Sequence, residues 1–395
     1  MHRANVTKKH LGWVLRLLIA AAGVAYILYT LNWTSRIALP DGSGLHVSRV
    51  SERWVTPAKP VETIAGLGDA DIVDGRIRRT ALEGGDPDQP ALEPSFLVVI
   101  REARHGLLFA GLCVFAPVFL IGALRWAVLM RARGIEVRYA RAYRLTMAGQ
   151  FFNLCMPGTT GGDVMKAYYA AKGTRQRADA VVSVAIDRVC GLVGLVLLVG
   201  IVGLFSLDDP IVRRLTLGMW AGLFALFLVA GLYASKSLRA RLRLGALVGK
   251  VPGAGPLRKL DALVAAYRHH LGALLAAVGL SLPIHLCLAL SMMLAGYALG
   301  IDRPAVFLLS TIPIVLLLWA LPVSGPLGLG PLDIVAVQLI TAGGETTAQQ
   351  AVMMFVAYRL FAVAVGLGGS LALFGSDAPS RSAASSDTPA DLNAV

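Results

Sequence analysis

Two Asp–Arg combinations recur at nearly the same spacing in a strongly apolar sequence. Asp163 is followed 25 residues later by Arg188, and Asp333 is followed 26 residues later by Arg359. An ionisable side chain inside an apolar segment is costly and marks a functional site by default. Because a guanidinium can neutralise a phosphate, we expect Arg188 and Arg359 to counter the charge of a phosphate-bearing ligand.

Each Asp stands directly after a Gly- and Pro-rich break between two half-length apolar segments. The first unit joins Leu145–Pro157 to Val164–Ala171, and the second joins Ala305–Pro322 to Asp333–Thr341. Basic residues flank both ends of the first unit, which predicts that both ends are cytoplasmic. Two half-segments whose ends lie on one side predict a re-entrant hairpin, which is tolerated at membrane depth only against protein or a polar cavity.

The second broken segment is expected to enter from the opposite face of the membrane. Each unit then consists of a half-helix, a break, an Asp that opens the next half-helix, and a full span that carries an Arg near mid-depth. This order predicts an inverted-topology repeat of the kind that secondary transporters use, with the binding site at the breaks.

The composition predicts an all-α polytopic membrane protein. The chain has 395 residues, of which 56% are hydrophobic and 15% charged, whereas soluble proteins carry about 25% charged residues. The net charge is +13, but the basic residues stand in short loops between apolar runs, so we expect them to set topology rather than to bind nucleic acid. The four cysteines lie in apolar segments without a CxxC or Cys/His cluster, so we expect no disulfide, metal site or cofactor.

We expect six transmembrane helices and two re-entrant hairpins. The predicted spans are Leu11–Leu31, Gly106–Met130, Ala178–Leu207, Leu215–Ala234, Leu271–Leu299 and Ala348–Phe374. The predicted division is an N-terminal transmembrane helix (1–31), a polar extracytoplasmic insert (32–100), a transmembrane core (101–375) and a disordered cytoplasmic tail (376–395). The insert is either a small β-rich module or a loosely ordered loop. Both termini are expected in the cytoplasm.

The two breaks are expected to meet near the midplane and to form a polar crevice for a lipid head group. Half-helix N-termini favour phosphate because their first N–H groups are unsatisfied and carry positive dipole. The candidate residues along the substrate path are Asn153, Thr159, Thr160, Gly161, Gly162, Asp163, Asp187, Arg188, Asp333, Tyr358 and Arg359. None of them is assigned a catalytic role.

Several of these charges also have a structural interpretation. Asp163 and Asp333 fit equally well as helix caps, and the arginines fit equally well in structural ion pairs within the membrane. Asp187 and Arg188 lie about 100° apart on a helix, which predicts that each has its own partner. Two further cations, Arg125 and Lys166, are expected to snorkel to the cytoplasmic interface.

Particular motifs resemble those of the lysylphosphatidylglycerol synthase transmembrane region family. The motifs, in order, are Gln150–Gly158, Gly161-Gly162-Asp163, Asp187-Arg188, Leu321-Pro322-Val323-Ser324 and Gly328-Leu329-Gly330. The resemblance covers about residues 101–374. It implies a bacterial inner-membrane protein with a lipid-handling role, because the family includes the flippase half of aminoacyl-phosphatidylglycerol synthases and many stand-alone membrane proteins.

This chain departs from the family pattern at the second break and at its ends. The family's Gly-x-Gly-x-Arg-Glu stands here as Gly-Leu-Gly-Pro-Leu-Asp from Gly328 to Asp333, which puts charge pairing of Asp333 in question. The insert lies outside the resemblance. The chain ends about twenty residues after the last predicted span, so we expect no synthase domain and no aminoacyl transfer from tRNA.

Three functions remain open from the sequence. The first is a lipid flippase or transporter, whose partner would be an anionic phospholipid or an isoprenoid-phosphate lipid. The second is a membrane-embedded enzyme of lipid metabolism, which ranks lower because the acidic residues are scattered at different depths. The third is a scaffold or accessory subunit of an envelope-synthesis complex that uses the insert as its contact surface. Either homo-oligomers or an envelope-synthesis partner would fit these alternatives.

Overall fold

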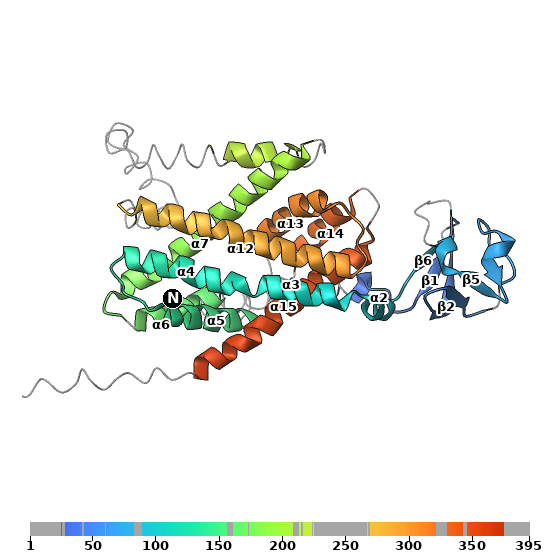
Figure 1. Cartoon of the computed structure of the whole chain (residues 1–395), viewed down its shortest axis with the longest axis horizontal. Coiled ribbons are helices and arrows are strands. Elements are labelled where there is room, and N and C mark those ends of the chain that lie inside the picture. The colour runs from blue at the N-terminus through green and yellow to red at the C-terminus, as the bar shows by residue number, and fades with distance from the viewer. Residues whose placement is uncertain are drawn as a thin grey trace, which may run out of the picture.

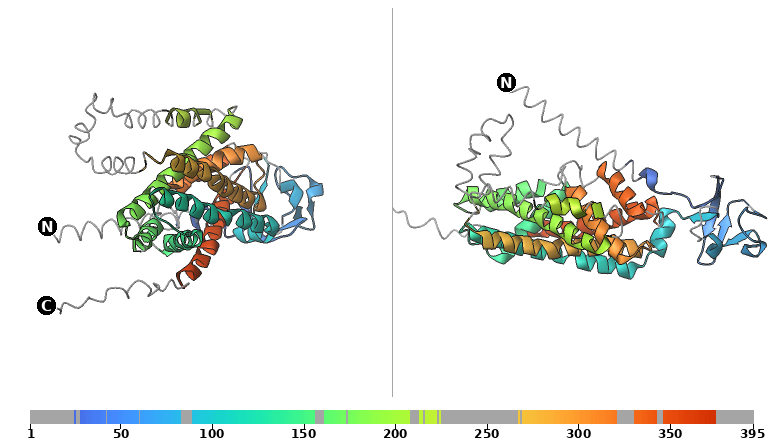
Figure 2. Two further views of the ribbon diagram at one scale, coloured as in Figure 1. Left: turned by 60° about the vertical axis from the view of Figure 1, so that its left-hand side comes forward. Right: turned by 90° about the horizontal axis from the view of Figure 1, so that it is seen from above.

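The structure is a computed structural model of the whole chain. It describes residues 25, 28–41, 43–59, 61–82, 89–155, 161–172, 174–207, 213, 214, 216–222, 224, 267, 269–320, 330–342 and 346–374. These residues form an elongated bundle of helices with a small β module beyond one of its ends (Figures 1 and 2).

The described helices follow the apolar segments of the sequence closely. They are α2 (Phe96–Glu102), α3 (His105–Phe115), α4 (Pro117–Ala132), α5 (Tyr139–Cys155), α6 (Gly161–Lys172), α7 (Arg177–Gly203), α12 (Leu271–Ala298), α13 (Ala305–Ala320), α14 (Leu332–Thr341) and α15 (Ala348–Phe374). Helices α3 and α4 run on from one another, because Pro117 stands in the first turn of α4, where its missing N–H breaks no helical hydrogen bond.

Four helical stretches are long and apolar enough to cross a bilayer. They are His105–Ala132, Arg177–Gly203, Leu271–Ala298 and Ala348–Gly369. They coincide with four of the predicted spans and confirm a polytopic α-helical membrane protein. The predicted spans Leu11–Leu31 and Leu215–Ala234 fall largely outside the described residues, as does the tail, so the count of six stays a prediction.

Both broken segments contain two separate half-length helices. In the first, α5 has 17 residues and α6 has 12, and in the second α13 has 16 and α14 has 10. The breaks themselves, 156–160 and 321–329, lie outside the described residues. Helix α5 begins at Tyr139 rather than at the predicted Leu145, because basic residues that end an apolar run do not end a helix.

The two helix pairs have opposite orientations: the ends of α13 and α14 that lie away from their break are at the module end of the bundle, and those of α5 and α6 are at the other end (Figure 1). At the module end, the Gln350 Nε2 donates a hydrogen bond to the Gly300 carbonyl, and Arg303 contacts the Ala342 carbonyl, so the outer ends of α13 and α14 lie together with the start of α15. At the other end, Arg133 bonds Asp179 at the start of α7 with an Nε···Oδ1 distance of 3.0 Å. The opposite directions agree with an inverted repeat, whereas re-entry into a membrane stays a prediction.

The largest buried apolar cluster lies where α3, α12, α13, α14 and α15 pack together. Its fully buried side chains include Met292, Leu308, Ile340 and Phe355. A second cluster, centred on Trp126, joins α4, α5, α6 and α7. Each cluster therefore surrounds one of the two broken segments with the long helix that follows it.

The insert is the β-rich alternative rather than a loop. Its strands are β1 (Arg36–Ala38), β2 (Gly44–Val50), β3 (Trp54–Pro57), β4 (Ile72–Val73), β5 (Arg76–Arg78) and β6 (Ala91–Glu93). They pair in the order β4-β5-β3-β2-β1-β6, and every pairing is antiparallel. A small core of its own, which includes Ile37, Val55 and Ile77, stabilises the module.

Candidate functional site

The first Asp–Arg combination forms an ion pair between α6 and α7. The Arg188 Nε donates to the Asp163 Oδ2 at 2.7 Å, and a terminal guanidinium nitrogen lies 2.5 Å from the same oxygen. Asp163 stands in the first turn of α6, where a carboxylate is favoured by the helix dipole. The Arg188 and Asp163 side chains are 42% and 35% exposed, so this pair is open to a ligand.

The second combination forms an equivalent pair between α14 and α15. A terminal nitrogen of Arg359 lies 2.5 Å from the Asp333 Oδ1. The other carboxylate oxygen of Asp333 accepts a hydrogen bond from the Gly330 N–H at 2.9 Å, so Asp333 also holds the backbone just before its helix. These side chains are only 11% and 3% exposed. The loss of the family's Arg at the second break therefore leaves Asp333 paired, through Arg359.

Both ion pairs join the first turn of a half-helix to the long helix that follows it in the chain. The pairs thus occupy matching positions in the two units, which is the arrangement that an internal repeat predicts. Arg359 also stacks over the Trp319 ring at 4.4 Å, and Tyr358 packs edge-on against Phe115 with ring centroids 5.4 Å apart. Tyr358 therefore belongs to an aromatic cluster behind the second pair.

A third charge cluster corrects the expectation for Arg125 and Lys166. The Arg125 Nε lies 2.8 Å from one oxygen of Asp187, and the Lys166 Nζ lies 3.3 Å from the other. Both cations are turned into the bundle rather than toward an interface, so the snorkelling interpretation is wrong. The prediction that Asp187 and Arg188 have separate partners is confirmed.

The Arg125 contact could not be predicted because its partner lies on a helix far away in the sequence. Arg125 is 62 residues before Asp187, and only the packing of α4 against α7 brings them together. A local signal did exist for Lys166. Asp163 and Lys166 are three residues apart on one helix and face the neighbours Asp187 and Arg188 on the next, so the two helices match charge for charge.

The glycines at the start of α6 allow a close approach to α5. A Cβ on Gly162 would overlap the carbonyl oxygen of Gly149 on α5. The Gly162 N–H donates to the Asn153 Oδ1 at 2.7 Å, so that oxygen links α5 to α6. The sequence had predicted that Asn153 faces a ligand. Gly161 is buried beside Gly162. Thr159 and Thr160 lie outside the described residues, and the shared crevice stays a prediction.

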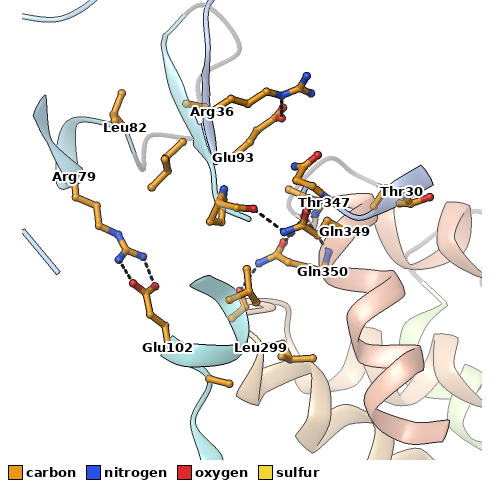
Figure 3. Close-up of a pocket in the computed structure, with 18 of the residues that line it drawn as sticks. Thr30, Arg36, Arg79, Leu82, Glu93, Glu102, Leu299, Thr347, Gln349 and Gln350 are labelled. Atoms are coloured by element: carbon orange, nitrogen blue, oxygen red, sulfur yellow. Dashed lines mark hydrogen bonds and ion pairs between the residues drawn. The ribbon is translucent and has the colours of Figure 1, made fainter. Parts of the chain in front are cut away.

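A polar pocket of about 730 Å³ lies between the β module and the core and was not expected from the sequence (Figure 3). Gln349 on α15 closes one side: its Nε2 donates to the Pro94 carbonyl and its Oε1 accepts from the Asn32 N–H, both at 2.8 Å. Arg79 makes a bidentate pair with Glu102 at 2.6 and 2.8 Å. The helix that carries Arg359 is therefore also tied to the module.

The comparisons with known proteins agree with the motifs. The family model described as "Lysylphosphatidylglycerol synthase TM region" matches residues 95–369, which include both Asp–Arg pairs and leave out the β module. No curated protein and no solved structure matches the chain. The match and the apolar helices show an integral membrane protein related to lipid metabolism. The chain belongs to the family of the lysylphosphatidylglycerol synthase transmembrane region.

Proposed function

We propose that this protein moves a lipid with a phosphate-bearing head group between the leaflets of the bacterial inner membrane. The observation that supports this most is the pair of matching Asp–Arg bridges at the starts of two half-helices that open toward opposite ends of the bundle. One bridge would serve the head group on each side of the crossing.

Each arginine is paired with a carboxylate, and a phosphate can take the place of that carboxylate as the anionic partner. An unpaired charge in an apolar interior is strongly unfavourable, so a guanidinium in the bundle needs an anion at every stage. A phosphate can replace the carboxylate on Arg188 or Arg359 and make a bidentate, charge-assisted contact of the same kind. The exchange keeps each arginine compensated while the lipid passes, and the displaced carboxylate then needs another cation or a proton.

The half-helix N-termini add a second kind of contact. The first N–H groups of a helix have no partner within it and favour anions. The Asn153 side-chain oxygen accepts from the Gly162 N–H in the first turn of α6, and the Asp333 carboxylate accepts from the Gly330 N–H just before α14. A phosphate oxygen would compete for such donors in the same way as it competes for the arginines.

Because the two bridges differ in exposure, we expect a head group to reach them one after the other. The Asp163–Arg188 bridge is open, whereas the Asp333–Arg359 bridge is enclosed. We therefore propose that a head group binds first at Arg188 and reaches Arg359 only after the helices around the second unit move. The termini would be cytoplasmic and the β module outside, and the protein would act as a transporter without catalysing a reaction.

The test is lipid exchange in vesicles that contain the purified full-length chain. Tail-labelled phosphatidylglycerol and tail-labelled phosphatidylcholine are followed by quenching of the outer leaflet. We expect exchange of the anionic lipid to exceed that in protein-free vesicles, and to exceed exchange of the zwitterionic lipid. Exchange no faster than in protein-free vesicles, for both lipids and for a polyprenyl-phosphate probe, would remove the proposal.

A further inference from the structure

The two units differ in one matched pair of residues. If Asp163 is superimposed on Asp333 and Arg188 on Arg359, then Lys166 corresponds to Ala336 and Asp187 corresponds to Tyr358. In the first unit, the Lys166 Nζ lies 3.3 Å from the Asp187 Oδ2. The second unit therefore lacks both members of this bridge while it keeps the Asp–Arg bridge beside it. Because both residues differ together, we infer that Lys166 and Asp187 act as a pair and that this pair belongs to the first unit alone.

The cluster around Asp187 holds more positive than negative charge. Arg125 and Lys166 share this carboxylate, and the three side chains are 12%, 7% and 11% exposed. Within the described part of the chain, neither cation has a second carboxylate within 4.0 Å. Two buried cations on one carboxylate leave an excess charge in a low-dielectric interior, which is unfavourable.

Only one group of the cluster can remove that excess. A guanidinium does not lose its proton in proteins, and a proton on Asp187 would increase the positive charge. The Lys166 ammonium can release a proton to water and become a neutral amine. Its charged form has support as well, because its Nζ lies 4.2 Å from the Trp126 ring centroid and beside Asp187. The two forms of Lys166 are thus balanced against one another.

We propose that Lys166 is a proton-binding site that couples lipid movement to a proton gradient. This rests on the proposed lipid transport. Lys166 lies one turn after Asp163 on α6. When a phosphate takes Arg188, the Asp163 carboxylate loses its partner and stabilises the Lys166 ammonium. Proton uptake at Lys166 and phosphate binding at Arg188 therefore favour one another, and by linkage each changes the affinity for the other by the same factor.

Among the groups around Lys166, the Lys166 amine is the one that we expect to gain or lose a proton. Asp187 on α7 pairs with Lys166 and with Arg125 from α4, and the next residue, Arg188, pairs with Asp163 on the helix of Lys166. Helix α12 contributes Ser281, which bonds Arg125, and His285, whose Nε2 is held 2.9 Å from the Gly191 carbonyl. Helix α5 approaches through Gly149, and α13, which packs on α7, carries no charged residue.

The first test observes the proton directly. The full-length protein is labelled with ¹⁵N-lysine, and the Nζ resonances are followed from pH 5 to pH 10, with Lys166→Arg as the assignment control. We expect one resonance, absent from the variant, to change from ammonium to amine within this range. A Lys166 resonance that keeps one form throughout overturns the proposal, whether or not the vesicles move lipid.

The second test observes the coupling. Vesicles with a pH gradient are assayed for exchange of tail-labelled phosphatidylglycerol, together with an internal pH dye. We expect the gradient to change the wild-type rate and the dye to report proton movement with the lipid. Lys166→Arg keeps the ion pair with Asp187 but cannot release a proton, so it loses both responses, whereas Lys172→Arg at the exposed end of α6 keeps them.

The outcomes separate the two proposals. Wild-type vesicles that move lipid without any response to the gradient contradict the coupling and leave the lipid transport standing. A response that survives in Lys166→Arg also contradicts it. Vesicles that move no lipid remove the transport proposal, while the resonance of Lys166 still decides whether the residue binds and releases a proton.

Discussion

The first and second units have the same spacing of charged residues but place them in different environments. The Asp163–Arg188 bridge is about one-third to two-fifths exposed, and a second charge cluster lies beside it. The Asp333–Arg359 bridge is enclosed, its carboxylate accepts a hydrogen bond from the Gly330 N–H, and Trp319 stacks against its guanidinium. Similar motifs thus hold an accessible charge pair in one unit and an enclosed one in the other, so the same substitution should act differently in each.

The largest effect is expected from breaking the enclosed bridge. Arg359→Gln leaves the Asp333 carboxylate buried without its cation, which should lower stability by about 3–5 kcal/mol. Thermal unfolding of the purified protein in detergent measures this change. The double variant Asp333→Asn/Arg359→Gln should recover much of the loss, because no charge is left uncompensated. Equal destabilisation in the single and double variants would show that the bridge is not the cause.

A smaller loss is expected where the two helices of the first unit touch. Gly162→Ala places a Cβ against the Gly149 carbonyl and the Asn153 side chain, so α5 and α6 must separate. Such overpacking typically costs about 1–3 kcal/mol. Gly122→Ala on α4, where a Cβ meets no atom within 4 Å, is the matched control. A melting temperature that falls equally in both variants would contradict the close approach.

The connection of the second unit to the β module gives a third, milder prediction. Gln349→Ala removes two hydrogen bonds that reach Asn32 and Pro94, which should cost about 2 kcal/mol. The readout is protease cleavage between the module and α3, which should become faster. Gln338→Ala, at an exposed position of α14, serves as control, and cleavage unchanged by Gln349→Ala would show that the module is held by other contacts.

The smallest effect on stability is expected at the open bridge. Arg188→Gln removes a pair that is partly solvated, so stability should change by less than about 1 kcal/mol. The same unfolding measurement as for Arg359→Gln provides the comparison. If both arginine variants lost equal stability, the distinction between an open and an enclosed unit would be wrong.

Most of the helical framework could be predicted from the sequence, because apolar runs and Gly/Pro breaks act locally. The four described spans and the half-helices on either side of each break follow directly from those runs. The Lys166–Asp187–Arg125 cluster could not be predicted, since it needs three helices to meet. The same holds for Gln349, whose contact with Asn32 bridges 317 residues of sequence. The β module could not be distinguished from a loop, because short alternating stretches occur in both.

The proposed transport depends on Arg188 and Arg359, which would bind a phosphate head group as it crosses the membrane. The measurement that tests it most directly is exchange of tail-labelled phosphatidylglycerol in vesicles that contain Arg188→Gln, with Arg138→Gln, an exposed position before α5, as control. Loss of a charge-assisted contact worth about 1.5–3 kcal/mol predicts a rate at least about tenfold lower for Arg188→Gln. The control should match the wild type. A folded Arg188→Gln protein that exchanges the lipid at the wild-type rate would contradict this role of Arg188.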